Sequence, residues 1–333
     1  MDAEKYKNVT VRRGYKYHYY YSPATAGKPT LLFIQGFPST SFDWSRQVAH
    51  FTPLGYGVLV PDCLGYGGTS KPTDWAEFRH KLIADDLVDV VDTEGLADVV
   101  AIGHDWGTAL VSALVHHYQD RFHAFVWLAA AYFPPNPHAF DLEQMCATLK
   151  EATGSELFGY WKLLTAPHGA RLIEEKMDSF LQLLYAADPD AWIEHFCPSG
   201  AIDKWLAEDR RPGLPKWLSE DEYKHIRNVL LEGGMTSPVN YYKVAANNGN
   251  LADHKALPEE QWYIKKPVLF FAATLDHVGR HAPNEETLAK YATNAEIIEL
   301  NVGHWVQLEA TDQMNEGLQQ WLLKLPPASA SLM

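Results

Sequence analysis

The short segment Gly103-His104-Asp105-Trp106-Gly107 places a carboxylate where a chain could carry out nucleophilic chemistry. It follows the apolar run Val99 to Ile102 and precedes a helix-like stretch. Glycines two positions before and after Asp105 would let a strand and a helix approach closely while the central side chain stands in a strained turn. A carboxylate is a poor acyl-transfer nucleophile, but it can attack a saturated carbon and form an ester. The alternative is that Asp105 only caps the helix.

Such an ester has to be hydrolysed, which requires a general base and an acid that orients it. His304, in Val302-Gly303-His304-Trp305, is the candidate base, and Asp276, after an apolar run that begins at Val268, is the candidate acid. A surface histidine and a turn aspartate are the ordinary alternatives. The order nucleophile, acid, histidine along the chain favours one catalytic group.

The oxyanion that develops on Asp105 during hydrolysis needs hydrogen-bond donors. Gln35-Gly36-Phe37-Pro38 follows the apolar run Leu31 to Ile34, and its glycine permits a tight backbone. We expect the backbone N–H groups of Phe37 and Trp106 to be these donors. An ordinary strand-to-helix turn is the alternative.

The elements that would position these residues are short buried strands separated by loops and helix-like segments. The stretch Val9 to Tyr21 alternates loosely and predicts an antiparallel hairpin at the sheet edge. The fold class is therefore α/β, with a mostly parallel central sheet and an antiparallel start. The expected strands are Leu31 to Ile34, Val58 to Val60, Val99 to Ile102, Phe125 to Ala129, Val268 to Ala272 and Ile297 to Leu300.

Strand patterns fade in the middle of the chain and helical patterns replace them. Ser219 and Glu222 form an expected capping box there, and prolines 134, 135 and 137 mark the beginning of the segment. We predict a helical cap over residues 134–244, inserted into a core of residues 1–133 and 245–333.

Composition excludes several classes of function. The 333 residues hold 42 acidic and 28 basic side chains, a net charge of −14, which disfavours nucleic acid as a partner. Three separated cysteines indicate neither a disulfide framework nor a zinc ribbon. No apolar stretch is long enough for a membrane span, so a cytoplasmic location is expected. The final Ser-Leu-Met only loosely resembles a peroxisomal signal.

Several motifs resemble the α/β-hydrolase superfamily, and within it the epoxide hydrolases. The segment QGFPSTSFDW is similar to the HGFPxxxxxW motif of that family, and Asp62 to Pro72 is similar to its DxxGYGxSxxP loop. GHDWG and the GHW around His304 also match, and the resemblance extends from Tyr15 to Trp321. Gln35 departs from the pattern, because the family usually has histidine there.

The resemblance implies an α/β-hydrolase fold and two cap tyrosines that polarise an epoxide oxygen. Tyr160 matches the first cap position, and Tyr242, in Asn240-Tyr241-Tyr242-Lys243, resembles the family's NWYR segment. Tyr241 is an alternative to Tyr242, and a core role is the alternative for each of the 17 tyrosines. A small apolar epoxide and water are the implied partners, without a metal or organic cofactor, and a homodimer is left open.

Two other functions are compatible with this pattern. A haloalkane dehalogenase would use the same aspartate chemistry, although Phe37 occupies the place of a halide-holding Asn or Trp in that branch. A relative that senses a small apolar ligand would bind without turnover. A serine-type esterase is disfavoured because Asp105 has no hydroxyl. Regioselectivity, enantioselectivity, the physiological substrate and oligomeric state are left open.

Overall fold

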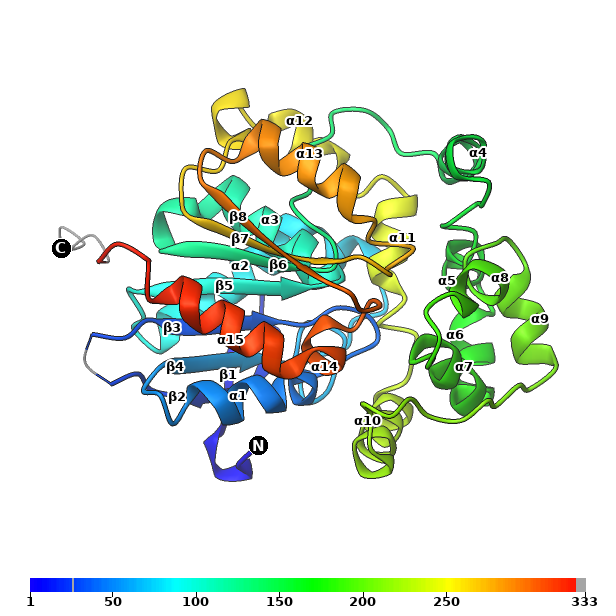
Figure 1. Ribbon diagram of the computed structural model, residues 1–333, viewed down its shortest axis with the longest axis horizontal. Helices are drawn as coiled ribbons and strands as arrows, with labels where there is room; N and C mark the ends of the chain where they lie inside the picture. Colours follow the sequence, from blue (N-terminus) through cyan, green and yellow to red (C-terminus); the bar gives the residue numbers. More distant parts are fainter. Residues whose placement is uncertain (26, 328–333) are drawn as a thin grey trace.

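A twisted sheet forms the centre of the molecule in this computed structural model, which describes residues 1–25 and 27–327 (Figure 1). Within these residues the sheet has eight strands in the order β1-β2-β4-β3-β5-β6-β7-β8. The strands are β1 (Tyr6–Thr10), β2 (Lys16–Ser22), β3 (Thr30–Ile34), β4 (Gly57–Pro61), β5 (Val99–His104), β6 (Ala124–Leu128), β7 (Val268–Ala273) and β8 (Ala295–Leu300).

The predicted mostly parallel sheet with an antiparallel start is confirmed. β1 pairs with β2, and β2 with β4, in antiparallel fashion, whereas all pairs from β4 to β8 are parallel. The register aligns Ile34 with Gly103 and His104 with Leu128. The carboxyl ends of β3, β5 and β6 therefore meet at one edge of the sheet, where the following loops can converge.

Both faces of the sheet are buried, because alternate residues of each central strand point to opposite sides. Leu32 and Ala101 pack into the cluster that contains α2 (His80–Thr93) and α3 (Trp106–Tyr118). Phe33 and Ile102 pack into the opposite cluster with α1 (Ser45–Phe51) and α15 (Thr311–Leu322). The remaining core helices are α12 (Leu251–Ala256), α13 (His281–Tyr291) and α14 (Val306–Glu309), whereas α11 (Asn240–Ala246) spans the predicted end of the cap at residue 244.

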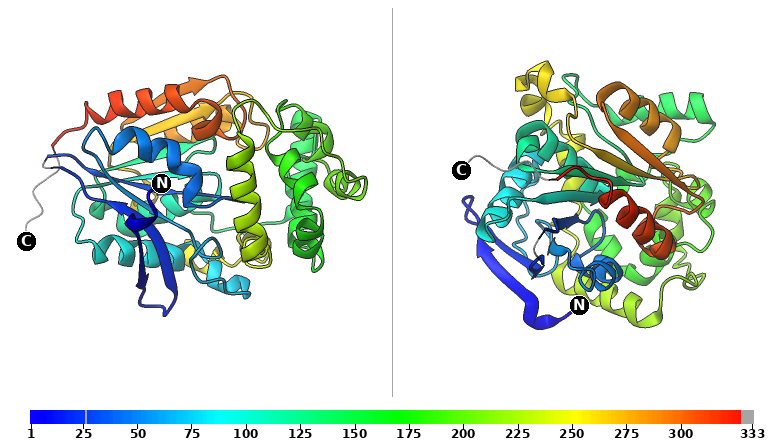
Figure 2. Two further views of the ribbon diagram at one scale, coloured as in Figure 1. Left: turned by 90° about the horizontal axis from the view of Figure 1, so that it is seen from below. Right: turned by 60° about the vertical axis from the view of Figure 1, so that its left-hand side comes forward.

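Helices without strands fill the described chain between β6 and β7, as expected for an inserted cap, and most of them lie together beside the sheet (Figures 1 and 2). The limits of 134 and 244 remain a prediction. We use "cap" for α4 (Leu142–Thr153), α5 (Trp161–Thr165), α6 (Gly169–Glu175), α7 (Met177–Leu184), α8 (Ala191–His195), α9 (Ala201–Ala207) and α10 (Glu220–Gly233).

Specific polar contacts attach the cap to the core. The predicted capping box of Ser219 and Glu222 begins α10. Arg46 of α1 binds the Glu222 carboxylate at 2.8 Å and donates to the backbone oxygens of Trp217 at 2.6 Å and Leu308 at 2.8 Å. One guanidinium thus joins α1, α10 and α14, which holds the cap in a defined position over the sheet edge.

None of the helices in the described ranges is long and apolar enough to cross a membrane. The carboxyl-terminal Ser-Leu-Met, considered above as a peroxisomal signal, lies outside the described residues.

Candidate active site

Asp105 stands in the turn between β5 and α3, as the sequence pattern predicts. Its backbone has φ 52° and ψ −124°, an unusual conformation for a residue other than glycine. The turn depends on small neighbours: a Cβ at Gly107 would collide with the Ile34 carbonyl oxygen, and one at Gly36 with the Asp105 carboxylate. Tight packing of three chain segments therefore holds the carboxylate at the carboxyl edge of the sheet.

The two expected oxyanion donors lie at this turn. The Phe37 N–H donates to Asp105 Oδ1 at 2.7 Å, and the loop that carries it follows β3 directly. Trp106 is the first residue of α3 and adjoins Asp105 in the chain. Its donation to an oxyanion remains a prediction, as does that of Phe37.

The structure brings the candidate base and acid to the same edge. His304 Nδ1 lies 2.7 Å from Asp276 Oδ2, and His304 Nε2 lies 3.5 Å from Asp105 Oδ2. Asp276 follows β7 and His304 follows β8. The Val278 N–H donates to Asp276 Oδ1 at 2.9 Å and helps to fix that carboxylate. The three side chains thus form a continuous chain of polar contacts.

Burial and charge act against each other in this group. Burial alone would lower the pKa of His304, but the charge of Asp276, the hydrogen bonds to both carboxylates and the charge of Asp105 together raise it above the usual value. Burial alone would raise the pKa of Asp276, but the His304 charge and hydrogen bond, with nearby backbone N–H groups, lower it. His304 is therefore cationic between two carboxylates when both are ionised.

Tyr160 and Tyr242 lie next to each other above Asp105, with ring centroids 5.9 Å apart. Burial, followed by neighbouring groups that include Asp105, holds the pKa of both hydroxyls well above the usual value, so both remain protonated donors. Tyr241 is directed elsewhere and donates to the Leu64 backbone oxygen at 3.1 Å. Of the two adjacent tyrosines, the structure brings Tyr242 to Asp105.

The chamber around these groups is small and lined by aromatic side chains. Its volume is ≈ 10 Å³, about the space of one water molecule. Five of its ten lining residues were not expected from the sequence, because no motif assigns them to the chamber. Besides Asp105, His304, Phe37 and the two tyrosines, the walls are Leu184, Trp192, Phe196, Val278 and Trp305.

Comparison with known proteins agrees with this fold. A family model described as alpha/beta hydrolase fold matches residues 29–151, and the solved epoxide hydrolase from an endophytic Streptomyces superposes with a TM-score of 0.81. The chain has the α/β-hydrolase fold. That Streptomyces structure is 25% identical and covers 96% of this chain and 95% of its own. Epoxide hydrolase A from Mycobacterium thermoresistibile, also 25% identical, superposes with a TM-score of 0.78 over 97% of this chain and 99% of its own.

Curated relatives of this α/β-hydrolase-fold chain are epoxide hydrolases as well. Bifunctional epoxide hydrolase 2 of Mus musculus is 28% identical over 320 residues, which cover 94% of this chain. The chain spans only 54% of the length of that relative. Epoxide hydrolase A of Mycobacterium tuberculosis is 28% identical over 315 residues, 90% of this chain and 92% of the relative.

Gln35, the departure from the family motif, is buried beneath the Phe37 loop. Its Nε2 donates to the Ser39 backbone oxygen at 3.2 Å, across the turn that contains Phe37. Its Oε1 is buried and has no hydrogen-bond partner in the described part of the chain. Within the described residues, the Gln35 amide thus supports the loop through its Nε2 atom only. The hydrogen bond from the Phe37 N–H to Asp105 is still present.

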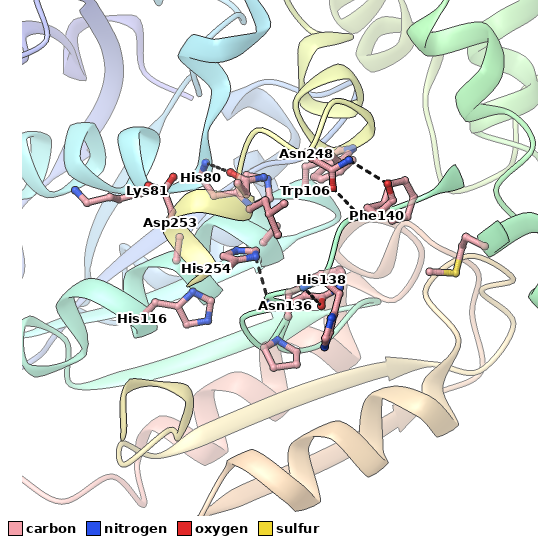
Figure 3. Close-up of a pocket in the computed structure, with 18 of the residues that line it drawn as sticks. His80, Lys81, Trp106, His116, Asn136, His138, Phe140, Asn248, Asp253 and His254 are labelled. Carbon is pink, nitrogen blue, oxygen red and sulfur yellow. Dashed lines mark hydrogen bonds between the residues drawn. The ribbon is translucent and has the colours of Figure 1, made fainter. Parts of the chain in front are cut away.

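A second cavity, of ≈ 290 Å³, is lined in part by Trp106 (Figure 3). It follows the α3 surface at Ala109, Ala113 and His116 and does not include Asp105. The sequence carried a weak signal for it, since alanines and histidines recur at helical spacing along α3.

Proposed function

We propose that this chain is an epoxide hydrolase that converts a small apolar epoxide to a vicinal diol through a covalent ester on Asp105. One observation carries the proposal: a carboxylate in a strained turn faces two protonated tyrosines and a histidine paired with a second carboxylate. The similarity to epoxide hydrolases over nearly the whole chain supports it.

In the first half-reaction, an Asp105 oxygen attacks one ring carbon and the carbon–oxygen bond of the oxirane breaks. Tyr160 and Tyr242 donate hydrogen bonds to the departing oxygen, and one of them transfers its proton to that oxygen to complete a hydroxyalkyl ester. The tyrosinate regains a proton from cationic His304 through water, which leaves His304 neutral for the next step. The burial of both hydroxyls strengthens these bonds, because the competing solvent is excluded. No metal or organic cofactor is required for this step.

In the second half-reaction, His304 deprotonates a water that attacks the ester carbonyl, and the Phe37 and Trp106 N–H groups receive the oxyanion. Ester formation removes the negative charge of Asp105, which is one of the groups that raise the pKa of His304. His304 therefore gives up its proton more readily in the ester than in the free protein. Collapse of the tetrahedral intermediate breaks the bond between the Asp105 carbonyl carbon and the diol oxygen, which takes a proton from the His304 imidazolium. The Asp105 carboxyl then returns its proton to His304, which restores the free protein and releases the diol.

Dehalogenation is the second candidate, and one observation favours it. The indole Nε1 of Trp161 is buried without a hydrogen-bond partner within the described residues, and its ring lies 5.5 Å from that of Trp106. Indole N–H groups are suitable donors for a halide ion. Halide release from a 1-haloalkane, followed with a pH indicator, tests this alternative. The two tyrosine hydroxyls favour the epoxide.

Single turnover in heavy-oxygen water, with protein in excess over styrene oxide, tests the covalent mechanism. The first diol should carry unlabelled oxygen from Asp105, and the label should enter the carboxylate. Diol formed from a second portion of styrene oxide should then carry the label. Solvent label in the first diol would contradict an ester intermediate. Binding of the epoxide without any diol would instead support a ligand-sensing protein.

A further inference from the structure

The ≈ 290 Å³ cavity beside the catalytic chamber has an opening, a floor and a wall whose chemistry indicates what it could bind. It opens at the surface, where Phe133 is 49% exposed and His138 is also exposed. Its floor is the α3 surface, where Ala109 and His116 are buried. Most of its wall is apolar, and its polar groups are mainly imidazoles and amides (Figure 3).

The two histidines His80 and His254 of the cavity wall are neutral. Burial, followed by the neighbouring His254, lowers the pKa of His80 to about 3, and burial also lowers the pKa of His254. His254 Nδ1 accepts the Asn136 N–H at 3.3 Å, so its proton resides on Nε2. His80 Nε2 is buried and lacks a partner among residues 1–25 and 27–327. The wall therefore offers uncharged hydrogen-bonding groups.

Charged groups at the cavity are already paired. Asp253 binds Arg79, and Lys81 binds Asp85 at 2.8 Å. No cluster of three histidine, cysteine or acidic side chains in the described ranges is arranged to hold a metal ion. A carboxylate in this cavity would lose its hydration without gaining a free cation, which is unfavourable in a protein of net charge −14.

Aromatic rings lie between the cavity and the catalytic chamber. Trp106 and Trp161 line the cavity, and their ring centroids lie 5.1 Å and 5.2 Å from that of Tyr242, which lines the chamber. The chamber, at ≈ 10 Å³, is too small for a substituted epoxide. A substrate must therefore extend beyond it, and the cavity behind these rings is large enough to receive a substituent.

We propose that this cavity binds the longer substituent of the epoxide, and that this substituent is uncharged and ends in a hydrogen-bonding group next to His80 and His254. The inference rests on the proposed function of Asp105 and adds the substrate class: apolar epoxides with a long arm that ends in a hydroxyl or carbonyl, in preference to epoxy acids. Trp161 is the side chain that shifts to connect the two spaces.

Binding can be measured without turnover. Histidine-labelled protein is titrated with n-octanol and with octanoate, and the ring signals of His80, assigned with the His80→Gln variant, are followed by NMR. We expect n-octanol to shift these signals and octanoate to bind at least about tenfold more weakly. Equal shifts with both probes, or none with n-octanol, would overturn the inference. Binding of n-octanol in a protein that forms no diol would leave the cavity site intact and refute the proposed function instead.

Turnover gives the second test. An epoxide whose long arm ends in a primary alcohol is compared with its carboxylate counterpart by kcat/KM. We expect a preference of about tenfold or more for the alcohol, the effect of one hydrogen bond near 1.4 kcal/mol. His80→Leu should abolish the preference and His80→Gln should restore part of it. The exposed cap residue His168 provides the matched control, because His168→Leu should keep the wild-type ratio. A ratio unchanged by His80→Leu would overturn the assignment.

The separation of the two spaces by aromatic rings is tested by Trp161→Ala. Removal of the indole should raise kcat/KM for epoxides with a branched long arm relative to styrene oxide, because the two spaces become continuous. If the ratio of kcat/KM for the branched epoxide to kcat/KM for styrene oxide did not change, the long arm would not pass Trp161.

Discussion

The imidazole of His104 is hydrogen bonded to the main chain of His304, with Nε2 2.8 Å from the His304 carbonyl oxygen. Gln307 Nε2 lies 3.3 Å from His104 Nδ1. His104 is fully buried, and burial lowers its pKa to about 4, so it is neutral near pH 7 and donates through Nε2. The residue before the candidate nucleophile therefore holds the backbone of the candidate base.

This contact predicts a specific defect in the second half-reaction. His104→Phe should lower the rate of ester hydrolysis about tenfold, since the His304 carbonyl would keep only its bond from the Val306 N–H and the loss of a buried hydrogen bond costs about 1–2 kcal/mol. Ester formation should change less. Rapid-quench measurements on styrene oxide separate the two rates, and His104→Gln, which keeps a donor, should recover part of the loss. Equal slowing of both rates would argue against this positioning role.

Loss of the base should trap the ester. His304→Gln should still react at Asp105 but hydrolyse the product slowly, so the intact mass should rise by the mass of one epoxide molecule. The double variant with Asp105→Asn is the control and should not gain mass. A His304→Gln protein that never accumulates the adduct would count against His304 as the base.

The charge of Asp105 should control the titration of His304. Asp105→Asn removes a negative charge that raises the pKa of His304, so this pKa should fall, as measured by NMR titration of labelled histidine. Because the pKa of His304 is higher in the folded than in the unfolded protein, its protonation stabilises the fold. This stabilisation is complete at pH values below the pKa of the unfolded state, ~6.5, and is lost as the pH rises through the pKa of the folded state. The difference in unfolding free energy between wild type and variant should therefore shrink at alkaline pH. An unchanged His304 pKa would contradict this coupling.

The two tyrosines should act on ring opening and not on ester hydrolysis. Tyr160→Phe or Tyr242→Phe should each lower the rate of ester formation about 10²-fold, and the double variant should abolish it. Tyr241→Phe is the matched control: it loses a bond to the Leu64 carbonyl, costs about 1 kcal/mol of stability and leaves ring opening unchanged. Full activity of the double variant would remove both hydroxyls from the mechanism.

Gly36 should tolerate no side chain. A Cβ there would overlap the Asp105 carboxylate and approach the Trp106 nitrogen to 2.6 Å. Gly36→Ala should therefore displace the Phe37 N–H and lower kcat about 10²-fold or more, as loss of one oxyanion donor does. Gly95→Ala, in a turn with open space, should cost about 1–2 kcal/mol of stability without a change in kcat. Near-normal kcat in Gly36→Ala would refute the role of this loop.

The amino-acid sequence by itself determined the strands and the turn at Asp105. Short continuous apolar runs such as Val99 to Ile102 are typical of strands in a sheet covered on both faces, and the local glycine spacing favours a tight strand-to-helix turn. Each observed central strand lies within one or two residues of its expected range, although Ala129, expected in a strand, lies past the end of β6 with φ 67°. These features are local, so they can be predicted from neighbours along the chain.

The tertiary structure alone decided which distant side chains meet. The direction of the Tyr241 side chain toward Leu64, the contact of His104 with His304 and the aromatic walls of the chamber depend on how distant segments pack together. The cavity lined by His80, on α2, and His254, on α12, has no motif, because residues more than 170 positions apart supply its walls. Packing energies between remote segments are summed over many weak contacts, and no short stretch of sequence encodes them.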